Sequence, residues 1–200
     1  ESSAAEQSSE TGVKQAELAK PDAMLFNTET VAGYAALSSL DGFKKMAADM
    51  MAKFQFLPAA MVPAMIDDGI KGPLQVQSLE WLDGSRPIVT VFGDLREQQD
   101  EGLLCMPLAS KALFEKSLPP SVEKDQDGNQ YKMIDPMGQP SYINVLGDAH
   151  VVLTPAANVF GKYEKLLQRD LAKVKPERTI EVVIRGEGVR SLTRGELDAA

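Results

Sequence analysis

The side chains best suited to nucleophilic catalysis are few in this sequence. It contains one histidine, His150, and one cysteine, Cys105. A nucleophilic serine or cysteine needs a base within hydrogen-bond reach, and His150 is the single imidazole that could serve. Cys105 lies in an apolar run, which predicts a buried thiol and not a reactive one. We therefore expect a non-catalytic protein and assign no catalytic residue.

Carboxylates gather at two places, Asp67-Asp68 and the acidic run within residues 94–102. A carboxyl group acts as a general acid only where burial or a neighbouring charge raises its pKa. The composition of residues 94–102 predicts a polar loop, in which a carboxyl group is neither buried nor held beside a charge that would raise its pKa. We interpret these carboxylates as solvated surface groups.

Residues 125–129 place oxygen ligands at alternate positions beside a glycine, as calcium loops do. An EF-hand loop requires a glutamate at its twelfth position, which counting from Asp125 assigns to Pro136. The segment fits a hairpin turn better. We predict no metal site and no cofactor.

Two pairs of methionines, Met46/Met50 and Met61/Met65, are spaced four residues apart in segments predicted to be helical. Thioethers can bind Cu(I), but methionines at this spacing more often fill a core or line an adaptable apolar groove. With Phe43 they form the candidate ligand-binding set: Phe43, Met46, Met50, Met61 and Met65.

A second candidate surface is a basic stripe on the last predicted helix. Helical spacing places its cations opposite the leucines of that helix. A solvated face is the default interpretation, and contact with an anionic membrane surface or an acidic partner is the alternative. The candidate partner-binding residues are Lys162, Lys165, Arg169 and Lys173.

The hydrophobic pattern around these residues predicts short strands and amphipathic helices. Apolar residues at helical spacing predict one helix containing Phe43 and Met46, and a second that Pro58 opens and Gly69 ends. Thr154-Pro155 begins the last helix, which Pro176 ends. A first strand is predicted at residues 23–27, helix starts at 31–37 and 38–41, a short helix at 110–118, and further strands at 74–82, 87–92, 103–108, 122–124, 130–134, 142–146, 150–153 and 179–184.

This order predicts an α+β domain, with an antiparallel sheet of about six strands and amphipathic helices packed on one face. We divide the chain into a disordered polar tether at residues 1–20, the domain at 21–178, and a final strand and stub at 179–200. The stub repeats the strand, turn and helix-start pattern near residue 24. It is either the start of a second repeat or a chance similarity.

Charge and hydropathy exclude some partners and suggest a compartment. The net charge of -8 argues against nucleic acid, which requires a surplus of Lys and Arg. Prolines interrupt the longest apolar run, residues 56–66, so we expect no transmembrane segment. The Ser/Glu-rich start is typical of tethers that follow an export signal or a lipid anchor, and a cytoplasmic protein with a frayed end is the alternative.

Two motifs give a resemblance to a known family. In residues 106–114 a strand leads through Pro107-Leu108 into a helix, and in residues 146–154 a Gly147-Asp148 hairpin leads into a strand and long helix. With the order of elements over residues 21–185, this pattern resembles an uncharacterised family of bacterial exported proteins and lipoproteins. The resemblance implies an extracytoplasmic α+β domain, in the periplasm or at the cell surface, and supplies no catalytic residues.

The resulting expectation is a non-catalytic extracytoplasmic binding or assembly module whose partner is an envelope protein or an anionic surface. The alternative is a carrier of a small apolar or lipid ligand in a Met/Phe-lined groove. The carrier requires an enclosed apolar cavity beneath the methionine helices. An enzyme would require a cleft in which His150 meets carboxylates.

Overall fold

The computed structural model describes residues 25–28, 30–54, 58–93, 102–125, 129–134 and 138–184. The predicted tether at residues 1–20 and the stub after residue 184 lie outside the described residues, as does nearly all of the acidic run at 94–102.

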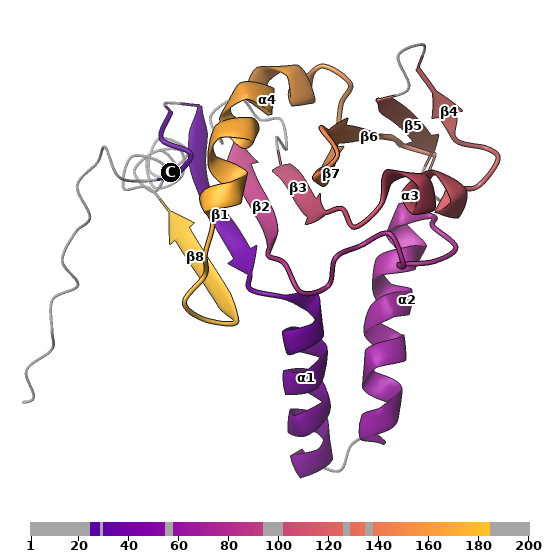
Figure 1. Ribbon diagram of the computed structural model, residues 1–200, viewed down its shortest axis with the longest axis vertical. Helices are drawn as coiled ribbons and strands as arrows, with labels where there is room; N and C mark the ends of the chain where they lie inside the picture. The colour runs from indigo at the N-terminus through magenta and orange to yellow at the C-terminus, as the bar shows by residue number, and fades with distance from the viewer. Residues whose placement is uncertain are drawn as a thin grey trace, which may run out of the picture.

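The described residues form an eight-stranded antiparallel sheet with four α-helices, which confirms the α+β class (Figure 1). Its strand order, β4-β5-β6-β7-β3-β2-β1-β8, puts the last strand beside the first. The strands are β1 Val31–Leu37, β2 Ile88–Gly93, β3 Gly102–Pro107, β4 Glu123–Lys124, β5 Gln130–Ile134, β6 Pro140–Leu146, β7 His150–Thr154 and β8 Ile180–Ile184.

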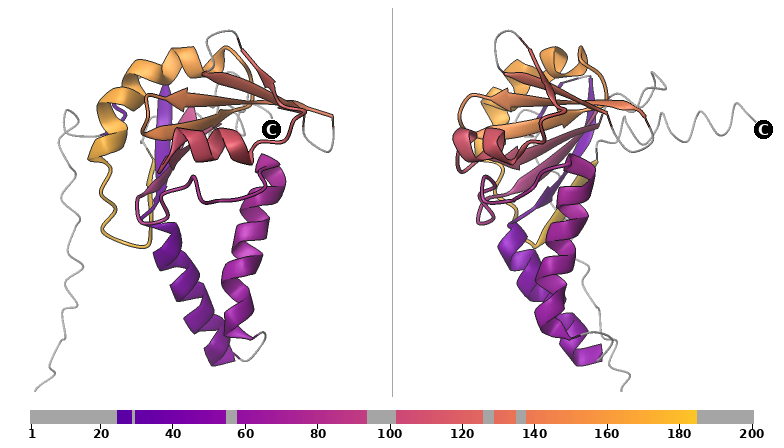
Figure 2. Two further views of the ribbon diagram at one scale, coloured as in Figure 1. Left: turned by 45° about the vertical axis from the view of Figure 1, so that its right-hand side comes forward. Right: turned by 90° about the vertical axis from the view of Figure 1, so that its right-hand side faces the viewer.

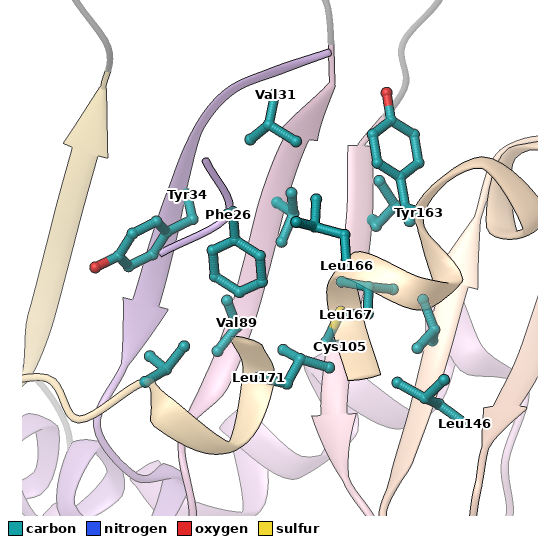
Figure 3. Packing of buried hydrophobic residues seen from close by; sticks show 14 of the residues in the cluster. Phe26, Val31, Tyr34, Val89, Cys105, Leu146, Tyr163, Leu166, Leu167 and Leu171 are labelled. Carbon is teal, nitrogen blue, oxygen red and sulfur yellow. The ribbon is translucent and has the colours of Figure 1, made fainter. Parts of the chain in front are cut away.

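Helices cover both faces of this sheet and not one alone. On one face, the apolar side of α4 (Val159–Asp170) packs over the central strands, and Figure 3 shows its leucines with Phe26 and Cys105 in this core. On the other face, α3 (Lys111–Ser117) and the segment from Val76 to Leu82 enclose a second core. The alternating side chains of the strands supply both cores, because successive residues point to opposite faces.

A helical hairpin projects from one end of the sheet. It consists of α1 (Leu40–Phe54), the short 3₁₀ helix η2 (Ala59–Met61) and α2 (Val62–Leu74), and Figure 2 shows the two long helices separated at the sheet and converging away from it. Ser39 begins α1 as predicted, since its Oγ accepts a hydrogen bond of 3.0 Å from the Gly42 backbone. Leu40 and Leu74 anchor the two ends of the hairpin in the second core.

The prediction for the first elements was wrong. Residues 31–37 form strand β1 and not a helix, whereas Phe26, predicted in the first strand, lies in a turn with a positive φ of 54°. The reason is non-local, because β1 pairs on both sides, with β2 and with β8. The backbone hydrogen bonds of these two pairings stabilise a strand more than the preceding threonines, Thr28 and Thr30, favour a helix start.

The predicted end of the second helix was also wrong. α2 continues through Gly69 and ends at Leu74, and Gln75 caps it in the left-handed conformation with φ of 52°. Pro63 lies in the first turn of α2, where its missing N–H costs no hydrogen bond. Residues 74–82 form no strand, and their one ladder contact is the isolated bridge from Leu82 to Leu108.

The last helix starts later than predicted. Thr154 is the final residue of β7, and α4 begins at Val159 after a turn. The helix then ends near the expected place, in the 3₁₀ helix η4 (Leu171–Lys173). The other predicted strands and the short helix at 110–118 are confirmed within one or two residues as β2 to β8 and α3.

Candidate functional site

The relative register of the two hairpin helices is fixed by a salt bridge between Lys44 of α1 and Asp67 of α2. Because the helices are antiparallel, each step forward along α1 is matched by one step back along α2. Met46 therefore lies level with Met65, and Met50 lies level with Met61. The four predicted methionines form two rungs across the hairpin.

The four methionines also lie on the same flank of the hairpin. On α1 the buried Ala47 marks the side that faces α2. We call the line along which the two helices face each other the seam. A rotation of about 100° per residue places Met46 and Met50 on one side of this seam and Lys44 on the other. The same rotation places Met61 and Met65 of α2 on the side of the seam away from Asp67. We call these four residues the methionine flank.

The methionine flank is exposed. The side chains of Met46, Met50, Met61 and Met65 are 41–52% exposed, whereas Phe43 continues the stripe toward the sheet and is half-buried. Methionine is flexible and polarisable, so a row of exposed methionines can adapt to an apolar partner of irregular shape. The structure thus places the five candidate ligand-binding residues at a protein surface.

A shallow depression borders this flank on the outer side of α1. Met46 and Met50 line it together with Gly42, Lys45, Asp49 and Lys53. These rim residues were not among the predicted site residues. Gly42, Asp49 and Lys53 each lie three or four residues from one of the two methionines, and this spacing was the signal that could have identified them.

The predicted basic stripe is exposed along α4 and η4, opposite the leucines, but two of its four cations have an internal role. Arg169 donates a hydrogen bond of 2.7 Å to Asp170, and Lys173 donates one of 3.2 Å to the same carboxylate. Asp170 also accepts a hydrogen bond of 2.8 Å from the backbone N–H of Phe26. Arg169 and Lys173 therefore stabilise the fold, whatever else they contact.

The environment of Asp170 favours its ionised form. Hydrogen bonds from Arg169, from the Phe26 backbone and from Lys173 lower the pKa of the Asp170 carboxyl to about 2, against the opposing effect of burial. The side chain is 4% exposed. No local sequence signal marked Asp170, because its partner Phe26 is 144 residues away in the chain.

His150 contacts a cation. The guanidinium of Arg86 lies 3.2 Å from Nε2 of the imidazole, which accepts the hydrogen bond when it is neutral. Burial, and secondly the charge of Arg86, lower the pKa of His150 to about 4. Among the described residues, the side-chain hydrogen bond of His150 is therefore to a cation and not to a carboxylate, which the cleft of an enzyme would require. Cys105 is fully buried, which raises the pKa of its thiol and keeps it protonated.

The other acidic candidates that the structure describes have structural partners. Asp125 accepts hydrogen bonds from the backbone N–H groups of Asn129 and Gln130, at 2.9 and 3.1 Å, and so closes the turn between β4 and β5. The antiparallel pairing of β4 with β5 confirms the predicted hairpin. Asp68 pairs with Lys71 at 3.3 Å. In the part of the chain that the structure describes, three or more His, Cys, Asp or Glu side chains nowhere gather as a metal site would require.

Comparison with family models, curated proteins and solved structures finds no match for this chain. In addition, none of the described helices combines the length and the apolar character needed to cross a membrane. The methionine flank, built from the hairpin register and the exposure of its side chains, is the candidate site on which a functional proposal can rest.

Proposed function

We propose that this protein is a non-catalytic extracytoplasmic binding or assembly module, and that the methionine flank contacts an apolar surface of an envelope protein. The observation that supports this proposal is the exposure of four level-paired methionines, 41–52% each, on one side of a projecting hairpin. The extracytoplasmic location rests on the sequence pattern, and fractionation of the full-length gene product tests it.

The hairpin is suited to this role because it stands away from the sheet, so a partner can reach its flank without disturbing either core (Figure 2). Fully burying a methionine side chain contributes about 1.5–3 kcal/mol. Four half-exposed methionines would contribute about 1 kcal/mol each when a partner covers them. The total of about 4 kcal/mol corresponds to a weak, millimolar contact, so a tighter complex requires contacts with the partner beyond the four methionines.

Site-specific photocrosslinking tests the proposal. A photoreactive amino acid replaces Met50 in one variant and Ala52 in another, and both are produced in the native envelope. Ala52 is exposed on the opposite flank of α1, which makes it a matched control. We expect a discrete cross-linked protein from position 50 and little from position 52.

A second variant makes the test specific for apolar contact. Met46→Glu with Met65→Glu places two charges on one rung of the flank, and we expect cross-linking from position 50 to fall at least tenfold. Ala52→Glu, which adds a charge on the other flank, should leave the cross-link unchanged. Equal cross-linking from positions 50 and 52, or no loss in the double variant, would refute the proposal.

The carrier alternative is less well supported. A carrier encloses most of the surface of its ligand, whereas the methionines of the flank lie at the surface beside a shallow depression. Native mass spectrometry of protein isolated from the envelope distinguishes the two functions. A small molecule released on denaturation would favour the carrier, and a cross-linked protein without such a molecule favours the binding module.

A further inference from the structure

The outer edge of β8 supports an inference that goes beyond the proposed function. β8 is the last strand in the sheet order, and it pairs with β1 from Gly33↔Ile184 to Leu37↔Ile180. Among the described strands, none pairs with its other side. The N–H and C=O groups along such an edge are a template for a further strand.

The two edges of the sheet differ in how they resist this kind of pairing. β4, at the far edge, has two residues, and both are exposed and charged, Glu123 and Lys124. Short length and charge protect an edge from strand addition. β8 is longer and presents Ile180, Val182 and Ile184 on one face, each 54–56% exposed. The edge at β8 therefore lacks the protection that the edge at β4 has.

The single charge in β8 is turned away from that apolar face. Glu181 lies on the face covered by α4, where it accepts a hydrogen bond of 3.2 Å from the Tyr34 hydroxyl. Alternation along the strand places Val183 on the same face, packed against the core of α4. A partner strand at this edge must therefore be apolar opposite the three exposed residues and must carry no acid opposite Glu181.

We propose that this partner is β8 of a second copy, paired antiparallel about a two-fold axis through Val182. In this register Val182 faces Val182 of the second copy, Ile180 faces Ile184, and Glu181 faces Val183. Every opposed pair is thus apolar or places the acid beside a valine. A register centred on Glu181 would oppose two carboxylates, which is unfavourable.

In this pairing, corresponding faces of the two copies lie on the same side of the joined sheet. Opposed residues of antiparallel strands point to the same face, so the α4 faces of both copies lie on one side and the exposed isoleucines and valines on the other. The same patch serves both copies, as a closed two-fold dimer requires. The result is one sheet that runs through both molecules.

Cysteine cross-linking tests the proposed register. Val182→Cys places two thiols opposite each other at about 5 Å between Cβ atoms, close to the span of a disulfide. We expect this variant to form a covalent dimer under mild oxidation. Ile180→Cys alone should not, because its two copies are four residues apart along the strands, about 13 Å. A mixture of Ile180→Cys and Ile184→Cys should form a dimer. The native Cys105 is fully buried and does not interfere.

Analytical ultracentrifugation measures the oligomeric state of the protein without any cross-link. We expect dimer at about 0.1 mM, and monomer for Val182→Lys with an unchanged melting temperature, since Val182 is exposed in the single copy. Monomeric wild-type protein at that concentration would overturn the proposal. So would equal cross-linking of Ile180→Cys and Val182→Cys, which indicates random collision. A dimer that Val182→Lys does not dissociate would place the interface elsewhere.

Discussion

Asp170 joins the two ends of the described chain through one carboxylate. It accepts hydrogen bonds from the Phe26 backbone N–H in the first turn and from the side chains of Arg169 in α4 and Lys173 in η4. A buried carboxylate is favourable only when such donors replace its lost water. At the scale of single residues, this cluster is one of the contacts that hold the segment before β1 against α4, beside the hydrogen bond of 3.2 Å from the Tyr163 hydroxyl to the Thr30 carbonyl.

Replacing Asp170 with Asn is expected to lower the free energy of unfolding by about 2 kcal/mol at pH 7, because the buried cluster loses its charge. Since the folded pKa of Asp170 lies below its ordinary value, its stabilisation is complete above about pH 4 and is lost as the pH falls toward 2. Urea unfolding from pH 7 to pH 2 measures both effects.

The control for this prediction is Asp68→Asn, at a carboxylate that is 76% exposed and makes a surface ion pair with Lys71. Surface pairs of this kind contribute little, so we expect a change below about 0.5 kcal/mol. If Asp170→Asn lowered the free energy of unfolding as little as Asp68→Asn does, the anchoring role assigned to Asp170 would be wrong.

At the scale of elements, the junction of β1 and β8 depends on Gly33. A Cβ atom at this position would lie 2.2 Å from the carbonyl oxygen of Val183, and the obstructing atom belongs to the backbone. β8 can approach β1 in the observed register only because Gly33 has no side chain. The register of β1 and β2 also shifts between Val31 and Gly33.

Gly33→Ala is therefore expected to displace β8 while leaving the rest of the sheet folded. Hydrogen exchange should show amides of β8 exchanging at least tenfold faster, with β2 and β3 unchanged. The matched control is Gly69→Ala in α2, where a Cβ atom meets nothing within 4 Å. That variant should gain about 0.5–1 kcal/mol of stability, because alanine favours a helix. Unaltered exchange in β8 for Gly33→Ala would contradict the assigned pairing.

Where one face of a segment is apolar, as in α4 and β2, periodicity alone predicted the element. Residues 31–37 were misassigned because alanine, leucine and valine fit either state and pairing with β8, distant in sequence, decides between them. Spacing also predicted that methionines share a helix face. It could not predict that the face stays uncovered, because exposure depends on where the hairpin meets the sheet.

At the scale of the whole molecule, the hairpin and the sheet are separable units. The hairpin touches the cores mainly at its base, through Leu40 and Leu74, with Ile66 and Ile70 partly buried against them. Between its base and its tip, the hairpin packs mainly against itself. Its distal part should therefore contribute to binding much more than to folding.

A variant in which a short Gly/Ser linker replaces residues 46–64 tests this separation. We expect its melting temperature to fall by no more than about 5 °C, because both cores keep their anchors. The buried Trp81 reports on the second core, and its near-ultraviolet circular dichroism should persist. Loss of that signal, or of cooperative unfolding, would show that the hairpin is part of the folding unit.

The length of α1 has one more consequence. Its 15 residues extend about 22 Å beyond the sheet. Whole helical turns could be added or removed there without altering either core, because the two helices of the hairpin need only keep matched lengths and their relative register. Evolution can therefore adjust how far this protein reaches independently of what holds it together, and orthologues are expected to differ in hairpin length by multiples of a turn, with the sheet as the constant base.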